Sequence, residues 1–204
     1  MNSLISFNTI RSIVTFCALS YFALLPIAHA VIPPPDGGYP GSNTAEGTSA
    51  LFNLTSGIDN TALGFQALFH NTTGNFNSAE GFRALFSNTA GVQNTASGAG
   101  ALISNTTGNF NTANGVNTLY HNTTGLQNTA MGVQALYSNT NGSFNTANGY
   151  QALFSNTIGY QNTALGCQAL YRNVAGAFNT ATGFGALTYN TDDYNTATGS
   201  FAAL

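Results

Sequence analysis

The feature that most constrains this chain is a short repeat that covers most of its length. From Asn43 onward the pattern N-T-A-x-G-x-x-A-L-x-x-N-T-x-G-x-x recurs with a 17-residue period, and it begins for the tenth time at Asn195 after one spacing of 16. Fixed-length repetition is typical of solenoids, in which each unit buries its apolar face only against its neighbours. Below, column n means the nth residue of every repeat.

Four columns of the repeat are candidates for the core. Column 3 is Ala in every copy, column 5 is Gly in every copy, and column 9 is Leu from Leu51 to Leu187. Column 10 is mostly aromatic, with Phe52, Phe69, Phe86, Tyr120, Tyr137, Phe154 and Tyr171. The predicted core includes Leu68, Leu85, Leu102, Leu119, Leu136, Leu153, Leu170 and Leu187, together with Gly64, Gly81, Gly98, Gly115, Gly132, Gly149, Gly166 and Gly183.

A single repeat unit cannot fold alone. Burying its Leu and its aromatic residue contributes roughly 2–3 kcal/mol each. Ordering each backbone position costs about 1–2 kcal/mol, so the sum over one unit is unfavourable. Neighbouring units must therefore stack, and their Asn and Thr side chains are expected to form turns and ladders between identical positions.

The spacing of the glycines decides between a helical and a β fold. Column 17 alternates Phe76, Gln93, Phe110 and Gln127, which gives a 34-residue super-period, a length that paired-helix repeats also use. Gly at columns 5 and 15 limits any helix to about eight residues, too short for a helical array. We therefore expect an all-β fold: a parallel β-solenoid or β-roll of about ten repeats. A short helical turn in each repeat stays open, as does the choice between a 17-residue and a 34-residue coil.

The N-terminal residues predict export. Residues 1–30 read as a secretory signal peptide, because an apolar stretch over residues 13–27 is followed by an A-x-A cleavage site at Ala28-His29-Ala30. A Pro/Gly-rich lead-in over residues 31–42 precedes the solenoid at residues 43–204, which ends in mid-repeat. No second apolar stretch follows, so we expect a secreted or cell-surface protein with no membrane span after cleavage.

Composition excludes several classes of function. Only 4% of the residues are charged and three are basic, whereas a nucleic-acid binder needs clustered Lys or Arg. So few ionisable groups also argue against an enzyme, and we expect no catalytic residue, no cofactor and no metal site. His70 and His121 share column 11, but three coils place them about 14 Å apart, too far to share a metal ion. They are expected to face solvent, and Cys167, in a column of apolar residues, is expected to be a small buried side chain.

Column 2 is the candidate functional feature. Stacked repeats would align its hydroxyl groups as a surface ladder, either to contact a ligand or only to stabilise turns. Its members are Thr61, Thr95, Thr112, Thr129, Thr146, Thr163 and Thr180, with Thr44 at the start.

The repeat also resembles a known family. The run Asn60-Thr61-Ala62-Leu63-Gly64-Phe65-Gln66-Ala67, with Gly74 later in the unit, is similar to the head repeats of trimeric autotransporter adhesins, the YadA-like heads. The resemblance covers about residues 43–204, and it implies a left-handed parallel β-roll, a homotrimer and a host-surface, matrix or glycan ligand. The 17-residue unit is longer than that family's typical unit, and neither a heptad stalk nor a membrane-anchor segment is present in the sequence.

These features predict an exported, non-enzymatic repeat protein that is adhesin-like or structural and acts through a stiff, multivalent surface rich in Thr, Asn and Tyr. An ice-binding β-solenoid is the alternative, because a regular solenoid can carry a flat Thr array. A polysaccharide-active β-helix is less favoured, because such sites need grouped carboxylates and the acids here are isolated.

Overall fold

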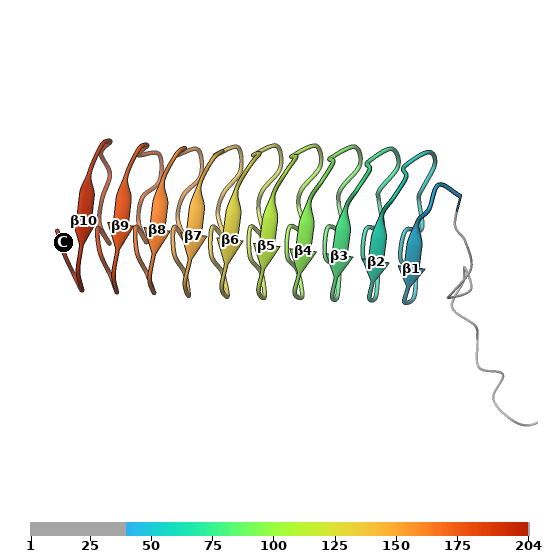
Figure 1. Ribbon diagram of the computed structural model, residues 1–204, viewed down its shortest axis with the longest axis horizontal. Coiled ribbons are helices and arrows are strands. Elements are labelled where there is room, and N and C mark those ends of the chain that lie inside the picture. Colours follow the sequence, from blue (N-terminus) through green and yellow to red (C-terminus); the bar gives the residue numbers. More distant parts are fainter. Residues whose placement is uncertain (1–39, 204) are drawn as a thin grey trace, which may run out of the picture. The chain divides into compact units, whose positions relative to one another are not determined.

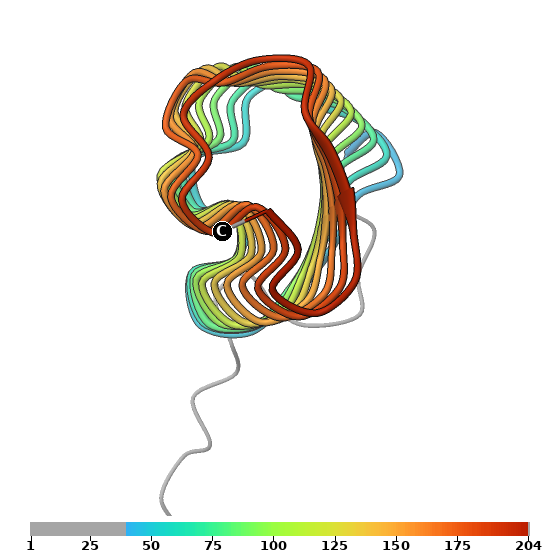
Figure 2. The same ribbon diagram turned by 90° about the vertical axis from the view of Figure 1, so that its left-hand side faces the viewer.

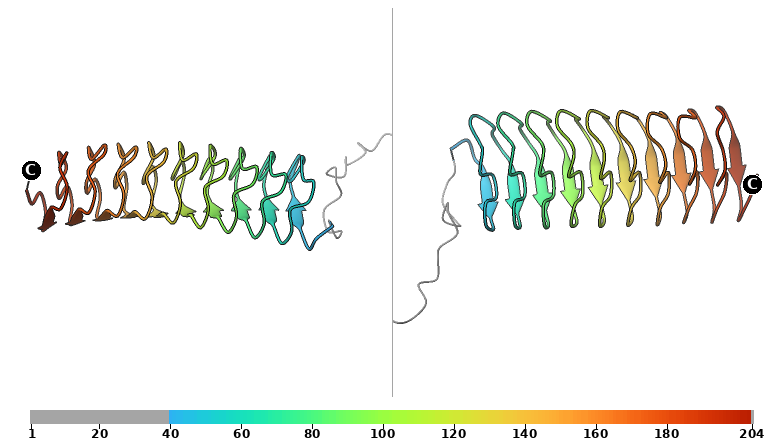
Figure 3. Two further views of the ribbon diagram at one scale, coloured as in Figure 1. Left: turned by 90° about the horizontal axis from the view of Figure 1, so that it is seen from above. Right: turned by 180° about the vertical axis from the view of Figure 1, so that it is seen from behind.

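Ten short strands, one per repeat, build the fold. The computed structural model describes residues 40–203, and their strands form one parallel sheet in the order β1 to β10 (Figures 1 and 3). The strands are Thr44–Glu46 (β1), Thr61–Leu63 (β2), Ser78–Glu80 (β3), Thr95–Ser97 (β4), Thr112–Asn114 (β5), Thr129–Met131 (β6), Thr146–Asn148 (β7), Thr163–Leu165 (β8), Thr180–Thr182 (β9) and Thr196–Thr198 (β10). The predicted all-β parallel solenoid is confirmed.

The strand register defines a 17-residue coil. Thr61 pairs with Ser78, Ala62 with Ala79, and the same offset of one repeat joins every strand from β1 to β9. The last pair, Thr180 with Thr196, keeps the same columns together across the shortened repeat. Identical columns therefore lie directly above one another along the solenoid axis, as the view down that axis shows (Figure 2).

The 34-residue super-period has a local cause in column 16. From Asn75 to Ser143, every second coil carries a polar side chain there that accepts a hydrogen bond from the column-16 N–H of the preceding coil. Asn75 Oδ1 lies 2.8 Å from Ile58 N, and Asn109 Oδ1 lies 2.8 Å from Val92 N. Alternation in sequence is thus a pairing between neighbouring coils, not a longer coil.

The interior of each coil holds small apolar side chains and amides. Ala at columns 3 and 8 and Leu at column 9 are buried in almost every repeat, and so are the Asn side chains of columns 1 and 12. Within a strand the central Ala is buried while its two neighbours face outward, as in Thr112–Asn114.

The buried amides form two continuous ladders along the solenoid. In column 1, Asn128 Nδ2 donates to Asn111 Oδ1 (3.1 Å) and to the carbonyl oxygen of Gly142 (2.9 Å). In column 12, Asn122 Nδ2 donates to Asn105 Oδ1 (2.8 Å) and to the carbonyl of Gly125 (3.1 Å). Because buried amides without partners are costly, these ladders oblige each coil to keep the register of its neighbours.

The optional helical turn in each repeat is not formed within residues 40–203. The backbone has positive φ at columns 7 and 9, for example 56° at Gln66 and 51° at Leu68, so the i to i−4 bonds of a helix cannot form. The N–H groups bond to adjacent coils instead, as from Leu68 N to Ala84 O (3.0 Å). The helical turn that the sequence left open is therefore replaced by hydrogen bonds between adjacent coils.

Column 17 offers a simple test of this backbone. Gln127 is exposed at φ 54°, a conformation that costs an L residue about 1–2 kcal/mol. We expect Gln127→Gly to raise the free energy of unfolding by about 0.5–1 kcal/mol, because the relieved strain exceeds the added entropy of the unfolded chain. Urea denaturation measures the change. The control Thr129→Gly, in strand β6, should lower the free energy of unfolding. Equal losses in both variants would contradict the presence of backbone strain at Gln127.

Candidate functional site

The outward surface of the sheet carries the predicted Thr ladder. We define the strand face as the side chains of columns 17, 2, 4 and 6, which flank the buried Ala of column 3. Thr95, Thr112, Thr129, Thr146 and Thr180 are exposed there, and Thr61 and Thr163 are half-buried. Direct pairing of column 2 spaces these residues by about one strand separation, 4.8 Å. All seven predicted residues therefore fall on one straight row.

Two further members of this row lay outside the sequence-based set. Ser78 pairs with Thr61 and Thr95, and Thr196 pairs with Thr180, so both extend the row. Ser78 was missed because only Thr was counted. Ser and Thr both carry a hydroxyl group, and counting that group in column 2 would have included Ser78.

The neighbouring outward column is chemically mixed. Column 4 contains Glu46, Leu63, Glu80, Ser97, Asn114, Met131, Asn148 and Leu165 before Thr appears at Thr182 and Thr198. A double row of Thr is therefore confined to strands β9 and β10. Over most of its length the hydroxyl row is one residue wide.

The aromatic residues of column 10 do not belong to the core, which corrects the sequence-based expectation. Phe69, Phe86, Tyr137 and Phe154 are only half-buried, because Ala, Leu and Asn already fill each coil. Their rings stack along the outside of the solenoid, with centroids 5.4 Å apart for Phe69 and Phe86 and 5.1 Å for Tyr137 and Phe154. Because each ring face covers the next, this aromatic stack exposes mainly ring edges.

The two histidines of column 11 pack against that stack. His70 is half-buried, not solvent-facing as expected, and its Nδ1 lies 3.1 Å from Asn53 Nδ2. Its ring contacts Phe69 and Phe86 edge-on. His121 is exposed, as expected. Among residues 40–203 no three His, Cys, Asp or Glu side chains gather in a way that could hold a metal ion.

Cys167 is a free thiol at the edge of the strand face. Its side chain is half-buried, whereas the apolar character of column 6 predicted a buried one. The difference arises because column 6 faces outward, as the exposed rings of Phe65, Phe82 and Tyr150 show.

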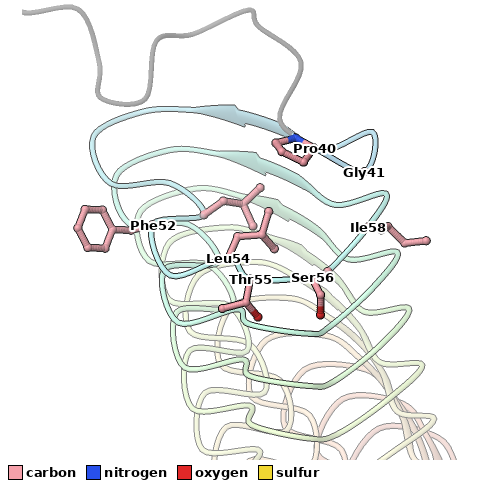
Figure 4. Close-up of a pocket in the computed structure, with 9 residues that line it drawn as sticks. Pro40, Gly41, Phe52, Leu54, Thr55, Ser56 and Ile58 are labelled. Atoms are coloured by element: carbon pink, nitrogen blue, oxygen red, sulfur yellow. The ribbon is translucent and has the colours of Figure 1, made fainter.

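A cavity of about 310 Å³ lies at the β1 end of the solenoid (Figure 4). Leu51, Leu54 and Ile58 line it together with Pro40 and Gly41. It is the end of the core column, on the side of the first described coil that faces away from the second. Its lining carries no ionisable side chain, so it offers no acid–base chemistry.

Comparison of the chain with family models, curated proteins and solved structures gave no match in any of the three. In the part of the chain that the structure describes, no helix is long and apolar enough to cross a membrane. The predicted signal peptide and most of the lead-in lie outside the described residues.

Proposed function

We propose that this chain is an exported, non-enzymatic repeat protein, adhesin-like or structural, which acts at the cell surface or in the extracellular matrix. The supporting observation is the register of the sheet, which brings the same outward side chain to the same place on every coil. A row of weak, identical contacts gains strength by multivalency without any single strong site.

The coil-to-coil bonding supports a stiff scaffold. Besides the strands, Leu68 N bonds to Ala84 O (3.0 Å), and Thr72 N bonds to Thr89 O (3.0 Å) on another side of the coil. The two Asn ladders add side-chain bonds inside. A surface that is ordered before binding loses little entropy on binding, which favours weak repeated contacts.

The location and assembly of the protein follow as parts of the proposal. Export would proceed through the signal peptide at residues 1–30. The resemblance to trimeric adhesin heads makes a homotrimer the assembly to test, with a host-surface, matrix or glycan ligand. Sedimentation equilibrium of the purified chain distinguishes three times the chain mass from one.

The hydroxyl row provides the functional test. We expect the triple variant Thr112→Val, Thr129→Val and Thr146→Val to reduce retention of chain-coated beads on matrix-coated plates and epithelial cells at least tenfold. Val preserves size and strand preference, so the fold should persist. The control variant Thr107→Val and Thr124→Val changes exposed residues of column 14, off the strand face. Equal retention of both variants would contradict a role for the row.

Ice binding is the second candidate, and the straight Thr row favours it. The double Thr arrangement of Thr180 and Thr182, repeated at Thr196 and Thr198, is the strongest point for it. Thermal hysteresis of a concentrated solution measures this activity directly. Loss of hysteresis in the triple Val variant would support the candidate, and no hysteresis in the unchanged chain would remove it.

A further inference from the structure

Column 17 places a row of exposed rings along one edge of the strand face. We call Phe76, Phe110, Phe144 and Phe178 the aromatic comb. Phe76 is 55% exposed and Phe110 and Phe144 are each 51% exposed, while Phe178 is half-buried. From Phe76 to Phe178 one ring occurs every second coil, so at a strand spacing of about 4.8 Å successive rings are about 10 Å apart. The next coil carries Tyr194 in the same column, and its ring stacks on Phe178 with centroids 4.9 Å apart.

Polar side chains occupy the gaps in the comb. Gln93, Gln127 and Gln161 lie in column 17 on the intervening coils, and all three are exposed. Within residues 40–203 their amides make no side-chain hydrogen bond, so they are available to a ligand. The Thr row of column 2 runs beside the comb.

The backbone holds the comb in place. Phe76 N donates to Ile58 O (3.0 Å), Phe110 N to Val92 O (3.0 Å) and Phe144 N to Leu126 O (3.0 Å). The column-16 bonds to Asn75 and Asn109 secure the adjacent residues of the same coils. The spacing between rings is therefore set by the solenoid.

The strand face is neutral along most of its length. From β4 to β10, columns 17, 2, 4 and 6 contain no Asp, Glu, Lys or Arg, and the acids Asp59, Glu46 and Glu80 all lie towards the β1 end. A face without basic residues does not attract an anionic polymer. Exposed rings beside hydroxyls and amides suit instead a neutral ligand with apolar faces and hydroxyl edges.

The two-coil period identifies the class of ligand. In an extended β-1,4-linked glycan, successive pyranose rings are turned over, so one ring face recurs at every disaccharide. One disaccharide is about as long as two coils of this solenoid. We infer that the strand face binds a neutral, extended β-1,4-linked polysaccharide, such as cellulose or chitin, along the solenoid axis. This inference rests on the proposed function and names the ligand class.

The other aromatic surface fits such a ligand less well. In the column-10 stack the faces of Tyr120, Tyr137 and Phe154 cover one another, with ring planes within 18° of parallel. Stacking on a sugar ring needs a ring face that no other ring covers. In the comb, Phe76, Phe110 and Phe144 meet this condition, because the adjacent coils carry Asp59 or Gln in column 17, whereas the ring of Phe178 stacks on Tyr194.

Retention on insoluble polymers tests the inference. We expect the purified chain to be retained on microcrystalline cellulose or on chitin beads, the two arms identifying the sugar, and not on granular starch, whose α-linked glucose chains coil. The double variant Phe110→Ala and Phe144→Ala should bind at least tenfold more weakly. The control Phe52→Ala removes a ring that is 59% exposed but lies outside the strand face, and it should bind as the unchanged chain does.

A change of period makes the test independent of ring removal. Inserting a second copy of the 17-residue coil 111–127 after Gln127 increases the separation of Phe110 and Phe144 along the axis from two coils to three. A 34-residue insertion, a copy of 111–144 placed after Phe144, keeps the two-coil period. Solenoid coils contact only their neighbours, so both variants should fold. The 17-residue insertion separates one Leu126 N–H from its acceptor, Ser143 Oγ, which lies 3.1 Å away in the unchanged chain, so the check is a cooperative urea transition in both variants. We expect the 17-residue insertion to weaken binding and the 34-residue insertion to retain it.

The outcomes separate this inference from the proposed function. Equal binding by the two insertion variants, or by the ring-removed and control variants, would overturn it. A second result would also overturn it: the unchanged chain binds no polysaccharide but self-associates, and the ring-removed variant does not self-associate. The comb would then be a contact between copies of the chain. If no polysaccharide binds but the Thr-row variant still loses surface retention, the inference fails and the proposed function stands.

Discussion

Gly132→Ala should lower the free energy of unfolding by more than about 4 kcal/mol or prevent folding. Gly132 has φ +126°, and a Cβ placed there would lie 2.6 Å from the carbonyl oxygen and 2.8 Å from the carbonyl carbon of Gly149. Both atoms belong to the backbone of the next coil, so relief would require the coils to separate. Urea denaturation and the yield of soluble chain measure the effect.

Gly100→Ala is the matched control. Gly100 also has positive φ (+68°), but the nearest atom to its Cβ would be the side-chain Oδ1 of Asn117, at 2.5 Å. A side chain can rotate away, and column 7 carries Gln at similar φ elsewhere, as at Gln134 (58°). We expect a loss below about 1.5 kcal/mol. Equal losses at the two glycines would show that conformation, not close approach, decides the effect.

Asn128→Leu should be nearly as damaging, with a loss of about 4 kcal/mol or more. Asn128 N and Nδ2 donate to Asn111 Oδ1 (3.0 and 3.1 Å), and its Oδ1 accepts from Asn145 N (3.0 Å) and Nδ2 (3.1 Å). Leu has similar size but cannot bond, so Asn145 N–H loses its acceptor, and Asn111 Oδ1, Asn145 Nδ2 and the carbonyl of Gly142 each lose one of two partners inside the core. Each buried group left unsatisfied costs about 1–3 kcal/mol.

The control for the ladder is Asn114→Leu, at an exposed strand position in column 4. A surface change there should alter stability by no more than about 0.5 kcal/mol. Hydrogen exchange adds a local measurement. Relative to the unchanged chain, Asn128→Leu should accelerate the exchange of backbone amides near Asn111 and Asn145 more than that of amides near β9. Equal acceleration along the whole solenoid would mean that the ladder does not stabilise its own coils locally.

The repeat alone determined the class of fold and much of its interior. Ala at column 3 and Leu at column 9 could be assigned to the core because a unit this short needs a continuous apolar column to fold. Gly at columns 5 and 15 excluded long helices, and the Thr row followed from repetition. These predictions depend only on the repeat period and on the side-chain type in each column, and both can be read from the sequence.

Only the tertiary structure decided how the columns face. Pairing of Thr61 with Ser78 set a 17-residue coil, and the 34-residue period became an alternation of neighbouring coils. Positive φ at Gln66 and Leu68 turned column 10 outward, so that Phe69 stacks on the surface. The same backbone exposed the ring of Phe110 in the comb. Side-chain direction outside regular strands depends on φ and on hydrogen bonds to other coils, and neither is written in the local sequence.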